Sequence, residues 1–153
     1  MKKSIQHMGT FFLIATFIFI FESCNKKKES LKIENAWVTE SIPGSGINAA
    51  YMKITNLSDK DETLLSIDCD NFETAEFHSM TEEGGVMKMN QMDSVLIKPG
   101  AAMVFEPGGA HIMLLKSKHD LKAGQKISLN LHFQNAGIKS LTGDVKKIED
   151  EAK

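Results

Sequence analysis

The sequence of 153 residues contains no arginine, because all 18 of its basic side chains are lysines. Arginine carries the planar fork that binds phosphates and guanine edges through two hydrogen bonds at once. The lysines are balanced by 20 acidic residues, which gives a near-neutral net charge of −2. A nucleic-acid-binding function is therefore disfavoured, and the length fits a single domain.

The one long uncharged run is at the start of the chain. Lys2 and Lys3 precede residues 8–21, MGTFFLIATFIFIF, which contain no charge. The run is shorter than the roughly 20 apolar residues of a conventional transmembrane helix. A basic start followed by a short apolar core is typical of an export signal. We therefore expect residues 1–23 to be a signal peptide and the protein to be exported into the cell envelope.

The residues after this run resemble a bacterial lipobox. Ser23 and Cys24 fit the cleavage site at which a cysteine becomes the lipidated first residue, whereas Phe21 and Glu22 depart from the usual aliphatic and small residues. This pattern predicts lipidation of Cys24, a tether over residues 24–31, and attachment to a membrane on the periplasmic side through acyl chains. Ordinary signal cleavage is the alternative.

Cysteine is scarce, with two residues in the chain. Once Cys24 carries lipid, Cys69 is the only thiol left, so the mature domain has no internal disulfide to form. Its fold must then rest on packing. Cys69 lies in the strand-like run LLSIDCD and is interpreted as a small buried hydrophobe.

The body of the chain has the pattern of an all-β domain. Short apolar runs alternate with turn residues such as Gly84-Gly85 and Pro99-Gly100 from about residue 31 onward. The expected strands are 49–55, 63–68, 72–78, 86–92, 95–98, 103–106, 111–116 and 127–133. This pattern predicts a β-sandwich or barrel over residues 32–146, followed by a charged tail at 147–153.

Soft metal donors gather in the middle of the sequence. Six of the nine methionines lie between residues 80 and 113, beside His78 and His111. His111 and Met113 share one face of an expected strand, and Met87 and Met89 have the same spacing across the turn that follows His78. Methionine more often fills a core than binds a metal, but this grouping indicates a metal site.

Two imidazoles and two thioethers favour copper(I). Thioether sulfur selects this soft ion, and two nitrogens with two sulfurs suit its tetrahedral preference. Zinc prefers thiolates, carboxylates or more histidines, and calcium or magnesium prefers oxygens. Thioethers need no deprotonation and cannot form a disulfide in an oxidising compartment. Such a site suits a carrier of copper(I) outside the cytoplasm.

The spacing of these donors resembles a known signature. His78, Met89, His111 and Met113 are separated by ten, twenty-one and one residues, as in the periplasmic copper chaperone family PCu(A)C. The blocks that also resemble the family, in order, are EFH at 76–78, GVMKM at 85–89, KPG at 98–100 and PGGAHIML at 107–114. The similarity covers roughly residues 33–145.

This resemblance implies a fold, a ligand set and a function. The fold would be a cupredoxin-like β-sandwich of Greek-key antiparallel strands, and His78, Met89, His111 and Met113 would be the copper(I) ligands. The protein would deliver the ion to a cuproprotein, in the family typically the copper centre of cytochrome c oxidase, often alongside a thioredoxin-like chaperone. The glycine-rich approach to His111 and the uncharged ligands favour delivery by ligand exchange. Some members also bind copper(II) through a His- and Met-rich tail, but residues 148–153 contain neither residue.

Several methionines and histidines outside the four expected ligands are weaker candidates for a role at the metal site. Met80, Met87 and Met92 are candidates for a surrounding shell of sulfur or for packing, and Met87 is also a candidate alternative ligand. His119 lies in a polar, loop-like stretch and His132 lies on the polar face of its expected strand, so both are expected to be solvated.

Other interpretations remain open at this point. Blue-copper electron-transfer sites use two histidines, a cysteine and a weak axial methionine, but Cys69 precedes both His78 and His111, unlike the order in that class. An enzyme is not expected, because the sequence shows no nucleophile–base set and no phosphate-binding glycine loop. The remaining alternative is a structural or adhesive envelope lipoprotein whose methionines and histidines only pack a β-sandwich.

Overall fold

A computed structural model describes residues 29–151, and the side chains of residues 29–149. The expected signal peptide, the lipidation site Cys24 and most of the expected tether lie outside the described residues. The elements are β1 Leu31–Thr39, β2 Ile47–Asn56, β3 Glu62–Asp68, β4 Phe72–Glu83, β5 Val86–Met92, β6 Val95–Ile97, β7 Ala102–Phe105, β8 His111–Ser117, β9 Lys126–Phe133, β10 Gly137–Lys146 and α1 Ile148–Glu151. In this part of the chain no helix is long and apolar enough to cross a membrane.

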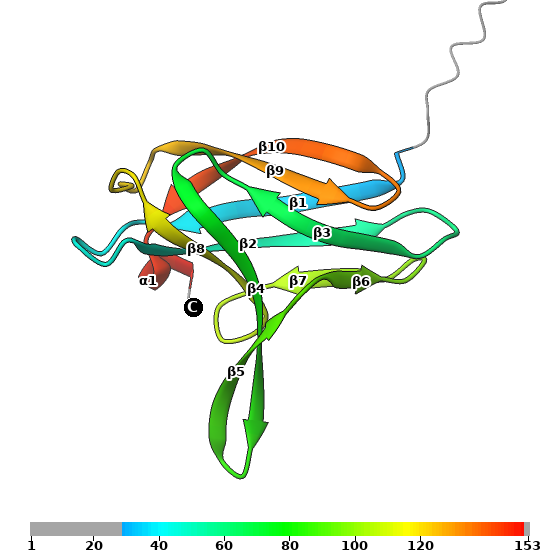
Figure 1. Ribbon diagram of the computed structural model, residues 1–153, viewed down its shortest axis with the longest axis horizontal. Helices are drawn as coiled ribbons and strands as arrows, with labels where there is room; N and C mark the ends of the chain where they lie inside the picture. Colours follow the sequence, from blue (N-terminus) through cyan, green and yellow to red (C-terminus); the bar gives the residue numbers. More distant parts are fainter. Residues whose placement is uncertain (1–28, 152–153) are drawn as a thin grey trace, which may run out of the picture.

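The strands form one hydrogen-bonded sheet that folds over into two layers (Figure 1). The strand order is β5-β4-β8-β2-β1-β10-β9-β3-β6, and β7 pairs with β2 beside this path. Strand β6 pairs with β3 and β7 pairs with β2, although β6 and β7 are separated by only a few residues. The sheet must therefore curve so that β2 and β3 lie on opposite sides of one core. The expected all-β fold is confirmed.

Alternation of apolar and polar residues explains why these segments form strands. In β9 the side chains of Ile127, Leu129, Leu131 and Phe133 are buried, and the residues between them are exposed or half-buried. Burying one such side chain contributes about 1.5–3 kcal/mol. Cys69 belongs to the same buried cluster, which confirms its interpretation as a core residue, and burial raises the pKa of its thiol.

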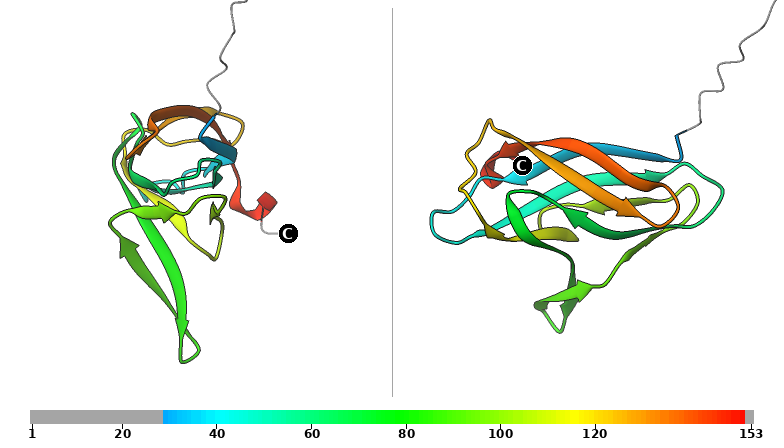
Figure 2. Two further views of the ribbon diagram at one scale, coloured as in Figure 1. Left: turned by 90° about the vertical axis from the view of Figure 1, so that its right-hand side faces the viewer. Right: turned by 45° about the horizontal axis from the view of Figure 1, so that its top comes forward.

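The β4–β5 hairpin projects from the body of the domain (Figures 1 and 2). Strand β4 continues to Glu83, so the expectation that it ends at His78 is wrong. The reason is pairing, because residues 77–83 of β4 align with residues 86–92 of β5 and find backbone partners there. His78 therefore lies in the middle of a long strand, at the base of the projecting hairpin.

Two glycines make the turn of this hairpin. Glu83 aligns with Val86, which leaves Gly84 and Gly85 as a two-residue connection with φ values of 62° and 79°. Such a turn needs left-handed backbone at both positions, which glycine adopts without a steric penalty. No atom lies within 4 Å of a Cβ built on either glycine, so the requirement is conformational rather than steric.

We predict that Gly85→Val loosens the hairpin without affecting the core. A β-branched residue with left-handed backbone costs about 1–2 kcal/mol, and this cost falls on the β4–β5 pairing. Amide hydrogen exchange of β5 should become faster, while exchange of β9 stays unchanged. Gly85→Asn is the matched control, because asparagine tolerates this backbone conformation. Equal exchange rates of β5 in the two variants would contradict the prediction.

Candidate metal centre

The four expected ligands come from three neighbouring strands and share one face of the sheet. His78 of β4 aligns with His111 of β8, and Met80 of β4 aligns with Met89 of β5. Residues directly opposite one another point to the same side of an antiparallel pair, as do residues two apart in a strand. The structure therefore brings His78, His111, Met113 and Met89 together at the base of the hairpin.

The two histidine rings lie side by side. Their centroids are 5.7 Å apart and their planes differ by 17°. Nδ1 of His111 lies 3.0 Å from the carbonyl oxygen of Gly109, and Nε2 of His78 lies 2.9 Å from Oε2 of Glu76. Carbonyl and carboxylate oxygens accept hydrogen bonds, so these two ring nitrogens donate. In the neutral rings the lone pairs are then on His111 Nε2 and His78 Nδ1.

The free nitrogen of His78 is placed as a metal ligand would be. Its Nδ1 is buried and has no hydrogen-bond partner among the described residues. A buried polar atom without a partner is costly, and a metal ion is one way to satisfy a nitrogen lone pair. A histidine that binds a metal through one ring nitrogen usually donates the N–H of its other nitrogen to an acceptor such as a carboxylate. This hydrogen bond fixes both the tautomer and the orientation of the ring. The residues present therefore fit a metal ion.

The orienting acceptors, Glu76 and the Gly109 carbonyl, were not expected from the sequence. Glu76 precedes His78 by two residues and so shares its strand face, a spacing that could have indicated the contact. The Gly109 carbonyl approaches His111 through a turn whose shape the sequence pattern does not specify.

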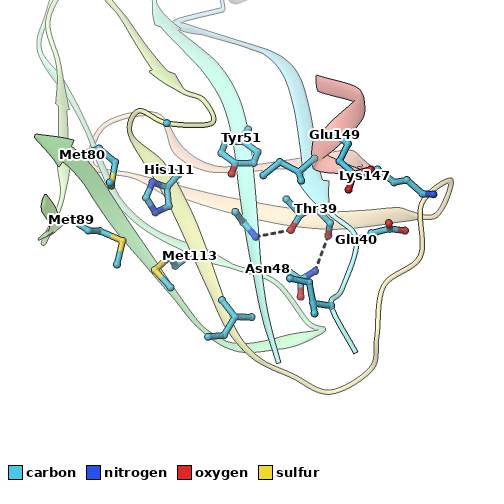
Figure 3. A pocket seen from close by; sticks show the side chains of 15 residues that line it. Thr39, Glu40, Asn48, Tyr51, Met80, Met89, His111, Met113, Lys147 and Glu149 are labelled. Atoms are coloured by element: carbon cyan, nitrogen blue, oxygen red, sulfur yellow. Dashed lines mark hydrogen bonds between the residues drawn. The ribbon is translucent and has the colours of Figure 1, made fainter. Parts of the chain in front are cut away.

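Three thioethers and the His111 imidazole line one end of an open hollow. A hollow of about 560 Å³ is lined by Met80, Met89, His111 and Met113, and Figure 3 shows these side chains gathered at one end of it. Tyr51 and residues 147–149 line other parts of the wall, so the expected charged tail contributes to the hollow through α1. Met89 is 52% exposed, whereas His78 is 7% exposed and does not line the hollow. The candidate donors thus range from the nearly fully buried His78 to the half-exposed Met89.

The donor chemistry of this face is soft and uncharged. Two neutral imidazoles and several thioethers add no formal charge to a bound ion. Among the residues that the structure describes, no group of three or more His, Cys, Asp or Glu side chains could hold a metal ion. Thioether sulfur selects copper(I), whereas zinc prefers thiolate, imidazole and carboxylate donors, so the donors present on this face suit copper(I) better.

Of the three expected shell methionines, the structure brings two to this face. Met80 lines the hollow. Met87 lies opposite Glu82, further toward the hairpin tip, and is exposed. Met92 lies opposite the buried Phe77 and packs against the core. Of the two roles left open for Met92, packing is therefore the one that the structure shows, because the alternation of β5 directs this side chain to the other face.

Cys69 lies far from the histidines. It precedes the start of β4 at Phe72, which is six residues before His78, or about 20 Å of extended strand. A blue-copper site needs a cysteine thiolate beside its two histidines, so the described residues exclude that arrangement here. His119 is exposed, as expected, and His132 pairs with Asp68 at 2.5 Å.

Comparison with known proteins identifies a family. The family model described as "Putative lipoprotein LpqE-like" matches residues 31–145. "Putative lipoprotein Lxx21020" of Leifsonia xyli subsp. xyli is 29% identical over 122 residues, which cover 79% of this chain and 72% of that protein. The uncharacterised protein RP573 of Rickettsia prowazekii is 32% identical over 99 residues, covering 63% of this chain and 55% of that protein.

Solved structures show the same fold. The copper-bound PCuAC domain from PmoF2 superposes with a TM-score of 0.68 at 22% identity, covering 78% of this chain and 94% of that domain. The copper(I) form of DR1885 from Deinococcus radiodurans has a TM-score of 0.62 at 26% identity, covering 74% of this chain and 76% of that chain. The expected cupredoxin-like sandwich is confirmed. The chain belongs to the LpqE-like family, and its described part has the fold of PCuAC domains.

Proposed function

We propose that the protein is an exported copper(I) chaperone that holds one ion with His78, Met89, His111 and Met113. The observation that carries this proposal is the placement of two imidazole lone pairs and two thioethers on one sheet face, with one of the lone pairs buried and unpartnered. The similarity to DR1885, whose solved form contains copper(I), supports the same ion.

Ligand exchange is the mode of delivery that this geometry favours. All four donors bind copper(I) in their uncharged forms, so exchanging one donor for another changes neither the charge of the ligand set nor the oxidation state of the ion. Each bond to a chaperone donor breaks as one to a recipient donor forms, and the ion remains copper(I). Met89 is on the outermost strand β5 and is half exposed, so a recipient reaches this donor first.

The place of action follows from the start of the sequence. Lipidation at Cys24 holds the domain at a membrane on the periplasmic side, and the name of the relative from Leifsonia xyli, "Putative lipoprotein Lxx21020", supports this placement. The recipient implied by the PCu(A)C resemblance is the copper centre of cytochrome c oxidase, with a thioredoxin-like chaperone as a further partner. Anchoring keeps the carrier and a membrane-bound recipient on one surface, which raises their effective concentration.

Anaerobic titration with copper(I) against a chromophoric chelator tests the proposal. We expect the full chain in detergent to hold one equivalent without visible colour. His111→Ala combined with Met113→Leu should weaken binding by at least about a hundredfold, since two ligands are lost and an orienting contact alone is worth about ten- to a hundredfold.

The matched control replaces one histidine and one methionine elsewhere. His132 pairs with Asp68, and Met103 packs against the core, so His132→Ala combined with Met103→Leu should bind copper like the wild type. If the wild type competes for no copper(I), the carrier function is wrong and the structural lipoprotein is favoured.

We also predict that Glu76→Ala weakens copper(I) binding by about ten- to a hundredfold. The carboxylate holds the His78 proton on Nε2 and so keeps the lone pair on Nδ1. Long-range nitrogen–proton NMR of the metal-free protein should show the Nε2–H tautomer in wild type and a mixture in the variant. Glu73→Ala is the control, because Glu73 is on the same strand but pairs with Lys116. An unchanged tautomer in Glu76→Ala would contradict this role.

A further inference from the structure

Met80 is placed like a ligand, although it is outside the expected ligand set. It aligns with Met89 across the hairpin and lines the hollow together with His111 and Met113. Figure 3 shows its side chain at the same end of the hollow as these three residues. His78, two residues away on β4, is almost fully buried and does not line the hollow.

The hollow by itself therefore contains a complete soft donor set. Met80, Met89 and Met113 supply three sulfurs, and His111 supplies an imidazole whose Nε2 lone pair is free, because its Nδ1 donates to Gly109. Three thioethers and one imidazole form a four-donor set, and thioether sulfur is the side-chain donor that selects copper(I). An ion entering from solvent meets these donors before it meets His78.

We propose that Met80 is a fifth copper(I) donor, which exchanges with His78 so that the ion has an outer and an inner position. The outer position uses Met80, Met89, His111 and Met113, and the inner one replaces the Met80 sulfur with Nδ1 of His78. This inference rests on the proposed copper(I) function and adds an entry and exit step to it.

In the exchange between the two positions one bond forms as another breaks, and the ion moves only a short distance. The bond from copper to the Met80 sulfur breaks as the bond to His78 Nδ1 forms, and the ion remains copper(I). The Nε2–H tautomer of His78 binds through its free Nδ1 lone pair, so this exchange of ligands transfers no proton. His78 and Met80 are two residues apart, or about 6.6 Å of strand. The other three donors are common to both sets, so the ion keeps at least three ligands throughout.

Met87 provides a matched comparison within the same hairpin. It carries the same thioether and is exposed, but it lies opposite Glu82 and does not line the hollow. Leucine conserves the volume of methionine while removing the sulfur. Met80→Leu and Met87→Leu therefore differ mainly in whether a sulfur at the hollow is lost.

The first test measures copper(I) affinity and ligand number in the full chain in detergent. His78→Ala should still hold one copper(I), with X-ray absorption showing three sulfurs and one nitrogen. Adding Met80→Leu should weaken binding by a further factor of about ten or more, whereas adding Met87→Leu should leave it unchanged. Equal effects of the two additions would overturn the proposal.

A second test leaves the buried histidine intact, in case His78→Ala does not fold. Stopped-flow transfer of copper(I) to a chromophoric chelator should be about tenfold slower in Met80→Leu than in the wild type, because the exit position is lost. Met87→Leu should release at the wild-type rate. Identical rates in the two variants would refute the exit step. A wild type that binds no copper(I) would instead refute the underlying carrier function, so the two failures are distinguishable.

Discussion

The alignment of His78 with His111 is the constraint on which the candidate site depends. These residues are far apart in the sequence, and only the pairing of β4 with β8 brings their rings together. A shift of that register by one residue would turn His78 to the opposite face of the sheet. The core prevents such a shift, because Phe77 and Ile112 lie opposite each other on the other face and are both buried. Hydrophobic packing on one face thus positions the metal donors on the other.

The turn of the β4–β5 hairpin fixes the register of β5 against β4. Gly84 and Gly85 define which residues of β4 and β5 are opposite, and so align Met89 with Met80 rather than with His78. Strand β5 is at the edge of the sheet and most of its residues are exposed. The hairpin therefore combines a fixed register at its base with an open face, which suits a site that must release its ion.

Local patterns were sufficient to predict part of this arrangement. The spacing of His111 and Met113 depends only on strand alternation, and the limits of β5 follow from the flanking turns. The length of β4 was underestimated, since its outer half is held by pairing with β5 rather than by a buried pattern of its own. The burial of His78 and the contribution of α1 to the hollow depend on how distant elements pack. Such long-range contacts leave no periodic signal in the chain.

The candidate donors on this face of the sheet are all soft and uncharged, but they differ widely in solvent exposure. His78 is 7% exposed and its Nε2 is held by Glu76, whereas Met89 is 52% exposed on an edge strand. A thioether is an uncharged ligand on a flexible side chain, and a fixed imidazole in the interior is a more rigid one. In the proposed site, the buried imidazole would hold copper rigidly and the exposed thioether would hold it loosely. In that proposed site, affinity and release would depend on different residues, and a recipient would displace the outer sulfurs without disturbing the packed side of the sheet.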